Sequence, residues 1–276
     1  MKRALVFDSG VGGLSVLDAM VRANLALTMD YAADNAWLPY GSKSDADLRA
    51  RCPALIAALA EALAPDVIVV ACNTASTIAL DAIRAAVRQP VVGVVPPIKP
   101  AAALTQSGVI GLLATPATVA RAYTDDLIAR FAADAHVIRV GSTALVAAAE
   151  AKLAGETPDP PAIREAVDAL FNAPGGDALD VVALACTHFP LIVDELKGAA
   201  PRAIHWLDSG AAIARRVAEV GACGEGAATT RLALFTDARG AQTMRNALCV
   251  RGFSETAAIG AAPAFALSSR SVLTRA

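Results

Sequence analysis

Two short stretches, VVACNT at residues 69–74 and ALACTH at residues 183–188, decide the fold of this chain. Each is an apolar run of the kind that forms a buried strand, and each stops at a cysteine that small polar residues and a helical pattern follow. At such a strand-to-helix turn, backbone N–H groups and the positive end of the helix dipole converge and lower a thiol pKa. The matched surroundings predict two reactive thiols, Cys72 and Cys186, with one shared task.

Strand and helix patterns alternate outward from both stretches. Pro96 and Pro97 interrupt the alternation and predict a domain boundary. The expected strands are residues 4–8, 27–33, 66–71, 90–95, 108–114, 136–140, 180–185, 204–207 and 232–236. The expected helices are residues 14–22, 44–63, 75–87, 119–131 (after a turn at 115–118), 143–153, 162–171, 191–198, 208–220 and 242–248, with Asp208 as the N-cap of the eighth. This alternation is typical of an α/β fold with parallel sheets, here in two similar domains.

The two cysteines occupy the positions where α/β proteins bind ligands. In open parallel sheets, ligands bind outside the carboxyl ends of the strands. Cys72 and Cys186 both follow such an end, one in each domain, so a cleft between the domains would present them from opposite sides. Asp8, which ends the first strand, and His188, two residues beyond Cys186, are the neighbours expected to tune the thiols.

Two loops carry further polar residues. Pro39 and Gly41 mark residues 34–41 as a loop, and its Asp34, Asn35 and Tyr40 are expected outside the core. The glycine-rich turn DSGVGG at residues 8–13 follows a strand and precedes a helix. It does not complete the dinucleotide-binding fingerprint, because serine stands where the last glycine is required, but its backbone can approach a small anion closely.

The composition and charge of the chain argue against nucleic-acid-binding, membrane-spanning and secreted proteins. The 276 residues have a net charge of −2 and no basic block, which argues against nucleic acid as a partner. No apolar run approaches the roughly 20 residues needed to cross a bilayer, and the N-terminal run is too short for a signal peptide. We therefore expect a soluble, cytoplasmic protein without a membrane partner. The five cysteines include no CxxC pair, so free thiols are expected.

Paired thiols suit proton transfer at carbon. Inverting a stereocentre requires one group to remove a proton from one face and another group to deliver a proton to the opposite face, and thiolate and thiol are both reachable near neutral pH. Two alternatives stay open. Cys72, Cys186 and His188 could ligate zinc, although without the usual tight spacing, or both cysteines could be inert and buried. Glu150 is either a solvated helix residue or an acid near the thiols.

The chain resembles the glutamate racemases of the aspartate/glutamate racemase superfamily. The resemblance rests on motifs in family order, which are FDSGVGGLSVL, YAADNAWLPYGSKS, VVACNTASTIAL, VVGVVPPIKPA, GLLATPATV, ALACTHFPLI and LDSGAAIARR. Together they cover residues 4 to about 216. The resemblance implies two pseudo-symmetric doubly wound parallel-sheet domains with the active site in the cleft between them. The first domain would comprise residues 1–97 and 208–276, and the second residues 98–207.

The resemblance also implies a reaction and a site. The expected activity is two-base racemisation of glutamate with no cofactor and no metal, and its role would be to supply D-glutamate for peptidoglycan synthesis. Cys72 and Cys186 would be the bases. Asp8, Ser9, Tyr40, Gly41, Asn73, Thr74, Thr118, Thr187 and His188 match positions that hold substrate or assist the thiols, and Asp34 and Glu150 match assisting acids.

Partners and alternatives follow from the same resemblance. VVPPIKPA and SGAAIARR look like the proteobacterial subgroup, in which a UDP-linked muropeptide precursor activates some members. A monomer or a homodimer is expected. The reacting thiols do not set the length of the substrate side chain, so a racemase for aspartate or another amino acid is one alternative. A non-catalytic amino-acid binding protein on the same fold is the other.

Overall fold

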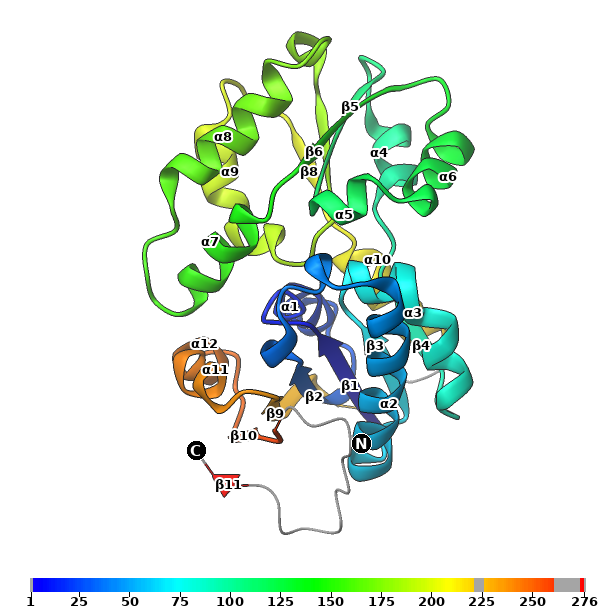
Figure 1. Ribbon diagram of the computed structural model, residues 1–276, viewed down its shortest axis with the longest axis vertical. Coiled ribbons are helices and arrows are strands. Elements are labelled where there is room, and N and C mark those ends of the chain that lie inside the picture. Colours follow the sequence, from blue (N-terminus) through cyan, green and yellow to red (C-terminus); the bar gives the residue numbers. More distant parts are fainter. Residues whose placement is uncertain (1, 221–225, 261–273, 276) are drawn as a thin grey trace. The chain divides into compact units, whose positions relative to one another are not determined.

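The computed structural model describes residues 2–220, 226–260 and 274–275 of the chain. These residues form two compact units (Figure 1). Unit 1 contains the described residues within Met1–Val94, Leu153–Gly155 and Gly210–Ala276, and unit 2 contains Val95–Lys152 and Glu156–Ser209.

Unit 1 is built on a sheet of seven strands. They are β1 (Lys2–Asp8), β2 (Leu27–Ala33), β3 (Val67–Val70), β4 (Val91–Gly93), β9 (Thr229–Phe235), β10 (Glu255–Ala258) and β11 (Thr274–Arg275). Their order is β11-β10-β9-β2-β1-β3-β4, and every pair is parallel except β10 with β11. The sheet therefore joins the start of the chain to strands that follow unit 2 in sequence.

Helices cover both faces of this sheet because its central strands are apolar on both sides. They are α1 (Leu14–Arg22), α2 (Asp45–Leu63), α3 (Asn73–Ala86), α10 (Gly210–Glu219), α11 (Ala238–Thr243) and α12 (Arg245–Cys249), with 3₁₀ turns at η1 (Asn35–Trp37) and η2 (Tyr40–Ser42). Val6 of β1 packs in one apolar cluster with residues of α1 and α10. Its neighbours Leu5 and Phe7 pack in a second cluster with residues of α2 and α3. Period-two alternation along a strand produces this division.

Unit 2 has a smaller sheet that is parallel throughout. Its strands β5 (Val109–Ala114), β6 (His136–Gly141), β7 (Val181–Leu184) and β8 (His205–Leu207) lie in the order β6-β5-β7-β8. Its helices are α4 (Ile98–Leu104), α5 (Pro116–Val119), α6 (Ala122–Phe131), α7 (Ala144–Leu153), α8 (Pro160–Phe171) and α9 (Val193–Ala199), with 3₁₀ turns η3 (Gly176–Ala178) and η4 (Phe189–Ile192). The predicted α/β class with parallel sheets is confirmed.

Several boundaries differ from the sequence prediction for local reasons. Helix α4 begins directly after the two prolines that predict a break, because proline is tolerated at a helix start. The turn predicted at residues 115–118 is the short helix α5, and the helix predicted to follow it is α6, which begins only after Ala120 and Arg121. The predicted N-cap Asp208 lies two residues before α10, and the hydroxyl of Ser209 donates to the carbonyl of Val95 at 2.6 Å.

The described residues also bear on three expectations about the whole chain. Cys52, Cys72 and Cys186 are buried free thiols and Cys249 is an exposed one, whereas Cys223 lies outside the described residues. Among the described side chains, no group of three or more His, Cys, Asp or Glu could hold a metal ion. None of the described helices is long and apolar enough to span a bilayer.

Gly176 is a position in unit 2 that has no room for a side chain. A Cβ atom there would lie 2.4 Å from the carbonyl oxygen of Phe171 and 2.6 Å from that of Leu170. Both are backbone atoms at the end of α8, so Gly176→Ala should lower the free energy of unfolding by about 2–3 kcal/mol. The matched control is Gly198→Ala in α9, where nothing lies within 4 Å of the new Cβ.

The control should raise stability by about 0.5–1 kcal/mol, because alanine is the better helix former. Urea unfolding followed by circular dichroism measures both variants against the parent chain. Equal midpoints for Gly176→Ala and the parent chain would contradict the prediction.

Candidate active site

In unit 1, Cys72 begins a chain of hydrogen-bonding groups that ends at a carboxylate. Cys72 is the N-cap of α3 and is 5% exposed. Its Sγ donates to Ser9 Oγ at 3.7 Å, and Ser9 Oγ donates to Asp8 Oδ1 at 3.4 Å. The same Asp8 oxygen accepts the N–H of Gly10 at 2.8 Å. The structure thus connects three of the predicted site residues, Asp8, Ser9 and Cys72, from two strand ends.

The pKa of Cys72 moves opposite to the expectation from its turn position. Burial raises the pKa of this thiol, and the neighbouring Asp8 carboxylate raises it further. Hydrogen bonds from the Ala75 N–H and the Ser9 hydroxyl lower it, but by less. The prediction of a lowered pKa at this cysteine was therefore wrong, because desolvation outweighs the helix terminus. At neutral pH, Cys72 is held as the thiol.

The glycine-rich turn packs closely behind Asp8. Tyr31 from β2 donates its hydroxyl to the Gly10 carbonyl at 2.6 Å. A Cβ atom on Gly13 would lie 2.8 Å from the Asp8 Cβ and 3.0 Å from the Tyr31 hydroxyl oxygen. Glycine is therefore required for close packing against the carboxylate. Asp8 itself uses one oxygen to cap this turn.

The first turn of α3 offers donors beside Cys72. Asn73 and Thr74 are each 5% exposed. Within the described part of the chain, the buried Asn73 Nδ2 has no hydrogen-bond partner. A buried donor without a partner costs about 1–3 kcal/mol, so it is a natural contact for an anionic ligand. The positive end of the helix favours the same charge.

Two polar side chains of the loop that follows β2 are buried, contrary to the sequence prediction, whereas Asn35 between them is partly exposed. Asp34 is 0% exposed and Tyr40 is 1% exposed. The Tyr40 hydroxyl donates to Asp34 Oδ2 at 2.6 Å. Polar side chains are buried where partners satisfy them, and the composition of the loop does not reveal those partners. The exposed fraction of Gly41, next to Tyr40, is intermediate.

The missing partners of Asp34 are Arg51 and Thr236, which sequence reasoning did not single out. Arg51 of α2 binds both carboxylate oxygens, and Thr236, which follows β9, donates to Oδ1 at 2.8 Å. A signal for Arg51 exists in the sequence. It lies three residues after Leu48 and four before Leu55, on the apolar face of the helix, where a charged residue indicates a buried ion pair.

In unit 2, Cys186 lies beside an imidazole that a carboxylate holds. Cys186 Sγ is 3.9 Å from His188 Nδ1, and His188 Nε2 is 2.8 Å from Glu150 Oε1. Cys186 and His188 are 7% and 3% exposed. Cys186 and His188 follow the carboxyl end of β7, and Glu150 reaches them from α7. Of the two readings of Glu150, the structure therefore has the acid near the thiol.

His188 is held as a cation. Burial lowers the pKa of His188, but hydrogen bonds and charge interactions with Cys186 and Glu150 raise it by more, so that it lies well above the usual value. Both ring nitrogens then carry protons, one directed at the sulfur and one at the carboxylate. An imidazolium beside a sulfur stabilises the thiolate form. Unit 2 therefore differs in its electrostatics from the carboxylate-flanked thiol of unit 1.

Two further predicted residues lie near the same edge of the second sheet. Thr118 in α5 is 0% exposed, and its hydroxyl is 3.0 Å from that of Thr115. These threonines follow β5, which pairs with β7 in parallel, so both strands end at one edge. Thr187, between Cys186 and His188, is 6% exposed. Each unit thus gathers its own set of predicted site residues.

Two α/β units, each with a buried thiol just after a parallel strand and a carboxylate within its hydrogen-bonded network, define a class of enzyme that moves protons with cysteine. The chain belongs to the Asp/Glu/Hydantoin racemase family, whose model matches residues 8–217. This membership confirms the resemblance predicted from the motifs, and with it the class of enzyme, an isomerase.

Individual relatives are similar over most of the chain. A glutamate racemase of Sphingopyxis alaskensis is 53% identical over 84% of this chain and 87% of its own length. A glutamate racemase of Pectobacterium carotovorum is 50% identical over 78% of this chain and 74% of its own length. The crystal structure of Escherichia coli glutamate racemase with L-glutamate and the activator UDP-MurNAc-ala superposes with a TM-score of 0.86. It is 42% identical and covers 94% of this chain and 98% of the crystallised one.

Proposed function

We propose that this protein interconverts L- and D-glutamate without a cofactor and so supplies D-glutamate for peptidoglycan synthesis. The proposal is supported by membership of the family and by two glutamate racemases that are 53% and 50% identical to this chain. The observation that carries it is the pair of unlike thiols. Cys72 is a buried thiol joined to Asp8 through Ser9, and Cys186 adjoins the His188 cation.

In the proposed reaction, both thiols act on one α-carbon and the protons balance without a co-reactant. The Cys186 thiolate removes the α-hydrogen as a proton, so that the C–H bond breaks and an S–H bond forms. The electron pair stays on the substrate as a carbanion that its carboxylate stabilises. Cys72 then gives its proton to the other face, so that its S–H bond breaks and a new C–H bond forms. In the opposite direction the two thiols exchange roles.

Neighbouring groups make each thiol suited to its resting state. His188, held by Glu150, stabilises the Cys186 thiolate before the reaction and can retain its proton throughout. Around Cys72 the Asp8 carboxylate favours the thiol, which is the form that delivers a proton. After delivery, Ser9 can turn its hydroxyl toward the new thiolate. The site therefore begins with one base and one acid.

The remaining predicted residues are proposed to hold the substrate. A glutamate carboxylate is an anion, and the partnerless Asn73 Nδ2 together with the first turn of α3 supplies donors for it in unit 1. In unit 2, Thr118 and Thr187 supply hydroxyl groups at the edge that carries Cys186. Tyr40 and Gly41 complete the set from the loop after β2. Preorganised donors of this kind stabilise the charge that develops on the substrate carboxylate.

A UDP-linked muropeptide precursor is proposed as an activator. The support is the Escherichia coli structure, which was crystallised with UDP-MurNAc-ala as its activator. The expected result is a higher kcat for this protein when UDP-MurNAc-alanine is added at saturating L-glutamate. A kcat that is independent of this compound would refute the activator while leaving the reaction itself intact.

Incubation in deuterated water tests the reaction. L-Glutamate should lose its optical activity and gain deuterium at the α-carbon, because the proton that a thiol delivers comes from solvent. A protein that only binds amino acids produces neither change, even at high concentration, and that result would overturn the proposal. Running L-aspartate in parallel separates a glutamate racemase from a racemase of wider or different specificity.

A further inference from the structure

The segment that follows β9 completes a buried polar cluster behind the loop of residues 34–42. The carboxylate of Asp34 accepts four hydrogen bonds and is fully shielded from solvent. Oδ2 accepts from Tyr40 Oη at 2.6 Å and from Arg51 Nε at 2.5 Å. Oδ1 accepts from Arg51 Nη2 at 2.7 Å and from Thr236 Oγ1 at 2.8 Å. The donors come from the loop itself, from α2 and from the segment that follows β9, which is 202 residues further along the chain.

Thr236 ties this loop to the end of the first sheet. Its N–H donates to the Ala33 carbonyl at 3.1 Å, and its hydroxyl accepts the N–H of Ala36 at 3.0 Å while donating to Asp34. One hydroxyl therefore fixes both the carboxylate and the backbone two residues further on. Valine has the same shape but can make neither side-chain bond.

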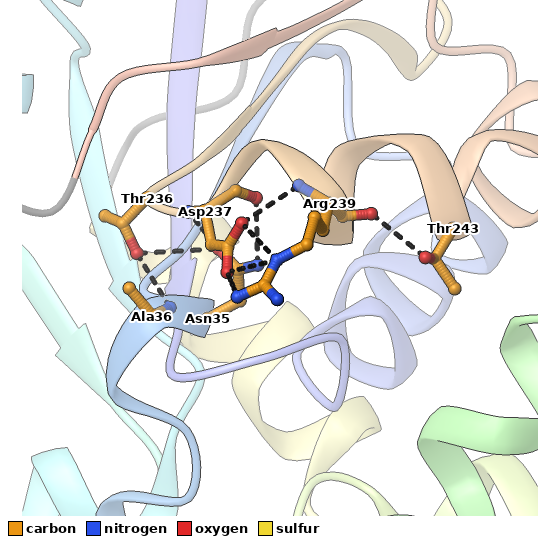
Figure 2. A network of polar contacts seen from close by, with 6 residues as sticks. All are labelled: Asn35, Ala36, Thr236, Asp237, Arg239 and Thr243. Carbon is orange, nitrogen blue, oxygen red and sulfur yellow. Dashed lines mark hydrogen bonds and ion pairs between the residues drawn. The ribbon is translucent and has the colours of Figure 1, made fainter.

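The next residue along repeats the attachment through an amide. Figure 2 shows Asn35 paired with the backbone of Asp237, with Nδ2 donating to the carbonyl at 3.0 Å and Oδ1 accepting the N–H at 2.9 Å. A Cβ atom on Gly240 would lie 2.1 Å from that Nδ2. The start of α11 therefore packs directly against the Asn35 side chain. The loop is thus held along its first residues by the segment 236–240.

The cluster is better explained as a positioning device than as a source of stability. Asp34 and Arg51 form a buried ion pair, with side chains 0% and 6% exposed. For such pairs the cost of desolvation commonly equals or exceeds the attraction, and apolar residues of the same volume are often as stable. Unlike apolar residues, the ion pair fixes the direction of each hydrogen bond in the cluster. The group it fixes is the Tyr40 hydroxyl.

Tyr40 connects the cluster to the reacting thiol. The 3₁₀ turn η2 that carries it contacts α3, whose N-cap is Cys72, and both side chains belong to one apolar cluster. The N–H of Asp34 donates to the Asp8 carbonyl at 2.9 Å. A shift of Asp34 is therefore transmitted both to Tyr40 and to the strand end that carries Asp8.

We propose that Arg51 and Thr236 are positioning residues for racemisation, acting through Asp34 to hold Tyr40 and its loop beside Cys72. The inference rests on the proposed function and extends it to residues that touch neither thiol. It also gives the segment after β9 a part in the active site of unit 1.

Replacement of Thr236 tests this in the full chain. Thr236→Val should lower kcat/KM for L-glutamate by about 10- to 100-fold, as expected for a misplaced substrate contact. Thr236→Ser keeps the hydroxyl and should stay within about threefold of the parent chain. Thr230→Val is the matched control, because Thr230 lies in β9, the strand that Thr236 follows, and donates at 2.8 Å to the Arg251 carbonyl instead. Its kcat/KM should be unchanged.

A double-mutant cycle distinguishes positioning from general loosening. If Thr236 acts through Asp34 and Tyr40, Thr236→Val should cost much less in a Tyr40→Phe background than in the parent chain. Arg51→Lys keeps the charge but loses the two-pronged contact, and should show a similar loss of kcat/KM even if Thr236→Val does not fold.

The outcomes are separable. No racemisation by the parent chain would overturn the proposed function itself. If the parent chain is active, three results would each overturn the positioning role alone. The kcat/KM of Thr236→Val could equal that of the parent chain, Thr236→Ser could lose as much kcat/KM as Thr236→Val, or Thr230→Val could lose as much as Thr236→Val. Additive losses in the cycle would do the same.

Discussion

Cys72→Ser and Cys186→Ser are each expected to lower kcat for racemisation at least about 1,000-fold, within the range that positioned acid–base groups contribute. Serine is nearly the same size, and both sites are less than a tenth exposed, so the fold should persist. The loss is chemical, because a hydroxyl is far harder to deprotonate than a thiol. The measurement is the initial rate of optical-activity change in both directions, with circular dichroism to verify the fold.

Cys52→Ser provides the matched control for this pair. Cys52 is also buried and free, and burial raises its pKa to about 12, so it is not available as a base at neutral pH. Its replacement should leave kcat within a few-fold of the parent chain, since none of the proposed proton transfers uses it. Near-normal activity in either Cys72→Ser or Cys186→Ser would remove the two-base assignment.

His188→Asn is expected to lower kcat/KM about 100-fold in both directions, because the two enantiomers have equal free energy and both directions share the step that uses the Cys186 thiolate. Asparagine retains an N–H but cannot carry the charge that stabilises the thiolate. The pKa of His188 is raised in the folded protein by its contacts with Cys186 and Glu150. The cation is therefore present at neutral pH, and the activity that depends on it is lost as pH rises through this pKa.

The same pKa determines a pH dependence of stability. Because the folded value exceeds the unfolded one, the contribution of His188 to stability is fully present below the unfolded pKa and disappears as pH rises through the folded pKa. The stability difference between the parent chain and His188→Asn should shrink over that interval. His136→Asn is the control, since His136 is exposed and its ring contacts the Pro174 carbonyl at 2.9 Å. A stability difference between the parent chain and His188→Asn that does not change with pH would contradict the assignment.

The sequence predicted the elements that carry chemistry more completely than the contacts between them. Residues 14–22 and 27–33 were predicted with the bounds that the structure has, because a clear apolar period and glycine punctuation define them. The strand ends at Cys72 and Cys186 were identifiable for the same reason. Glu150 could not be placed from its own helix, because its partner His188 is 38 residues away.

Long-range partners explain the remaining differences. Asp34 and Tyr40 belong to a loop with turn-forming residues, and local rules place such residues outside the core. They are buried because Arg51 and Thr236 satisfy them, and Thr236 is 202 residues from Asp34. The direction of the Cys72 pKa was missed for a related reason. A turn position reveals the helix terminus, whereas the burial and the Asp8 charge that outweigh it come from the assembled sheet.

The placement of β9 has a consequence for the order of events during synthesis. In unit 1 the edge of β2 that faces away from β1 is covered by β9, which the ribosome makes only after all of unit 2. Until then, β2 presents an unpaired strand edge and Asp34 lacks its Thr236 hydroxyl. All the strands of unit 2 lie between residues 109 and 207, so its sheet can close first. A nascent chain that stalls before residue 229 would thus carry a finished second sheet and an open, aggregation-prone first one.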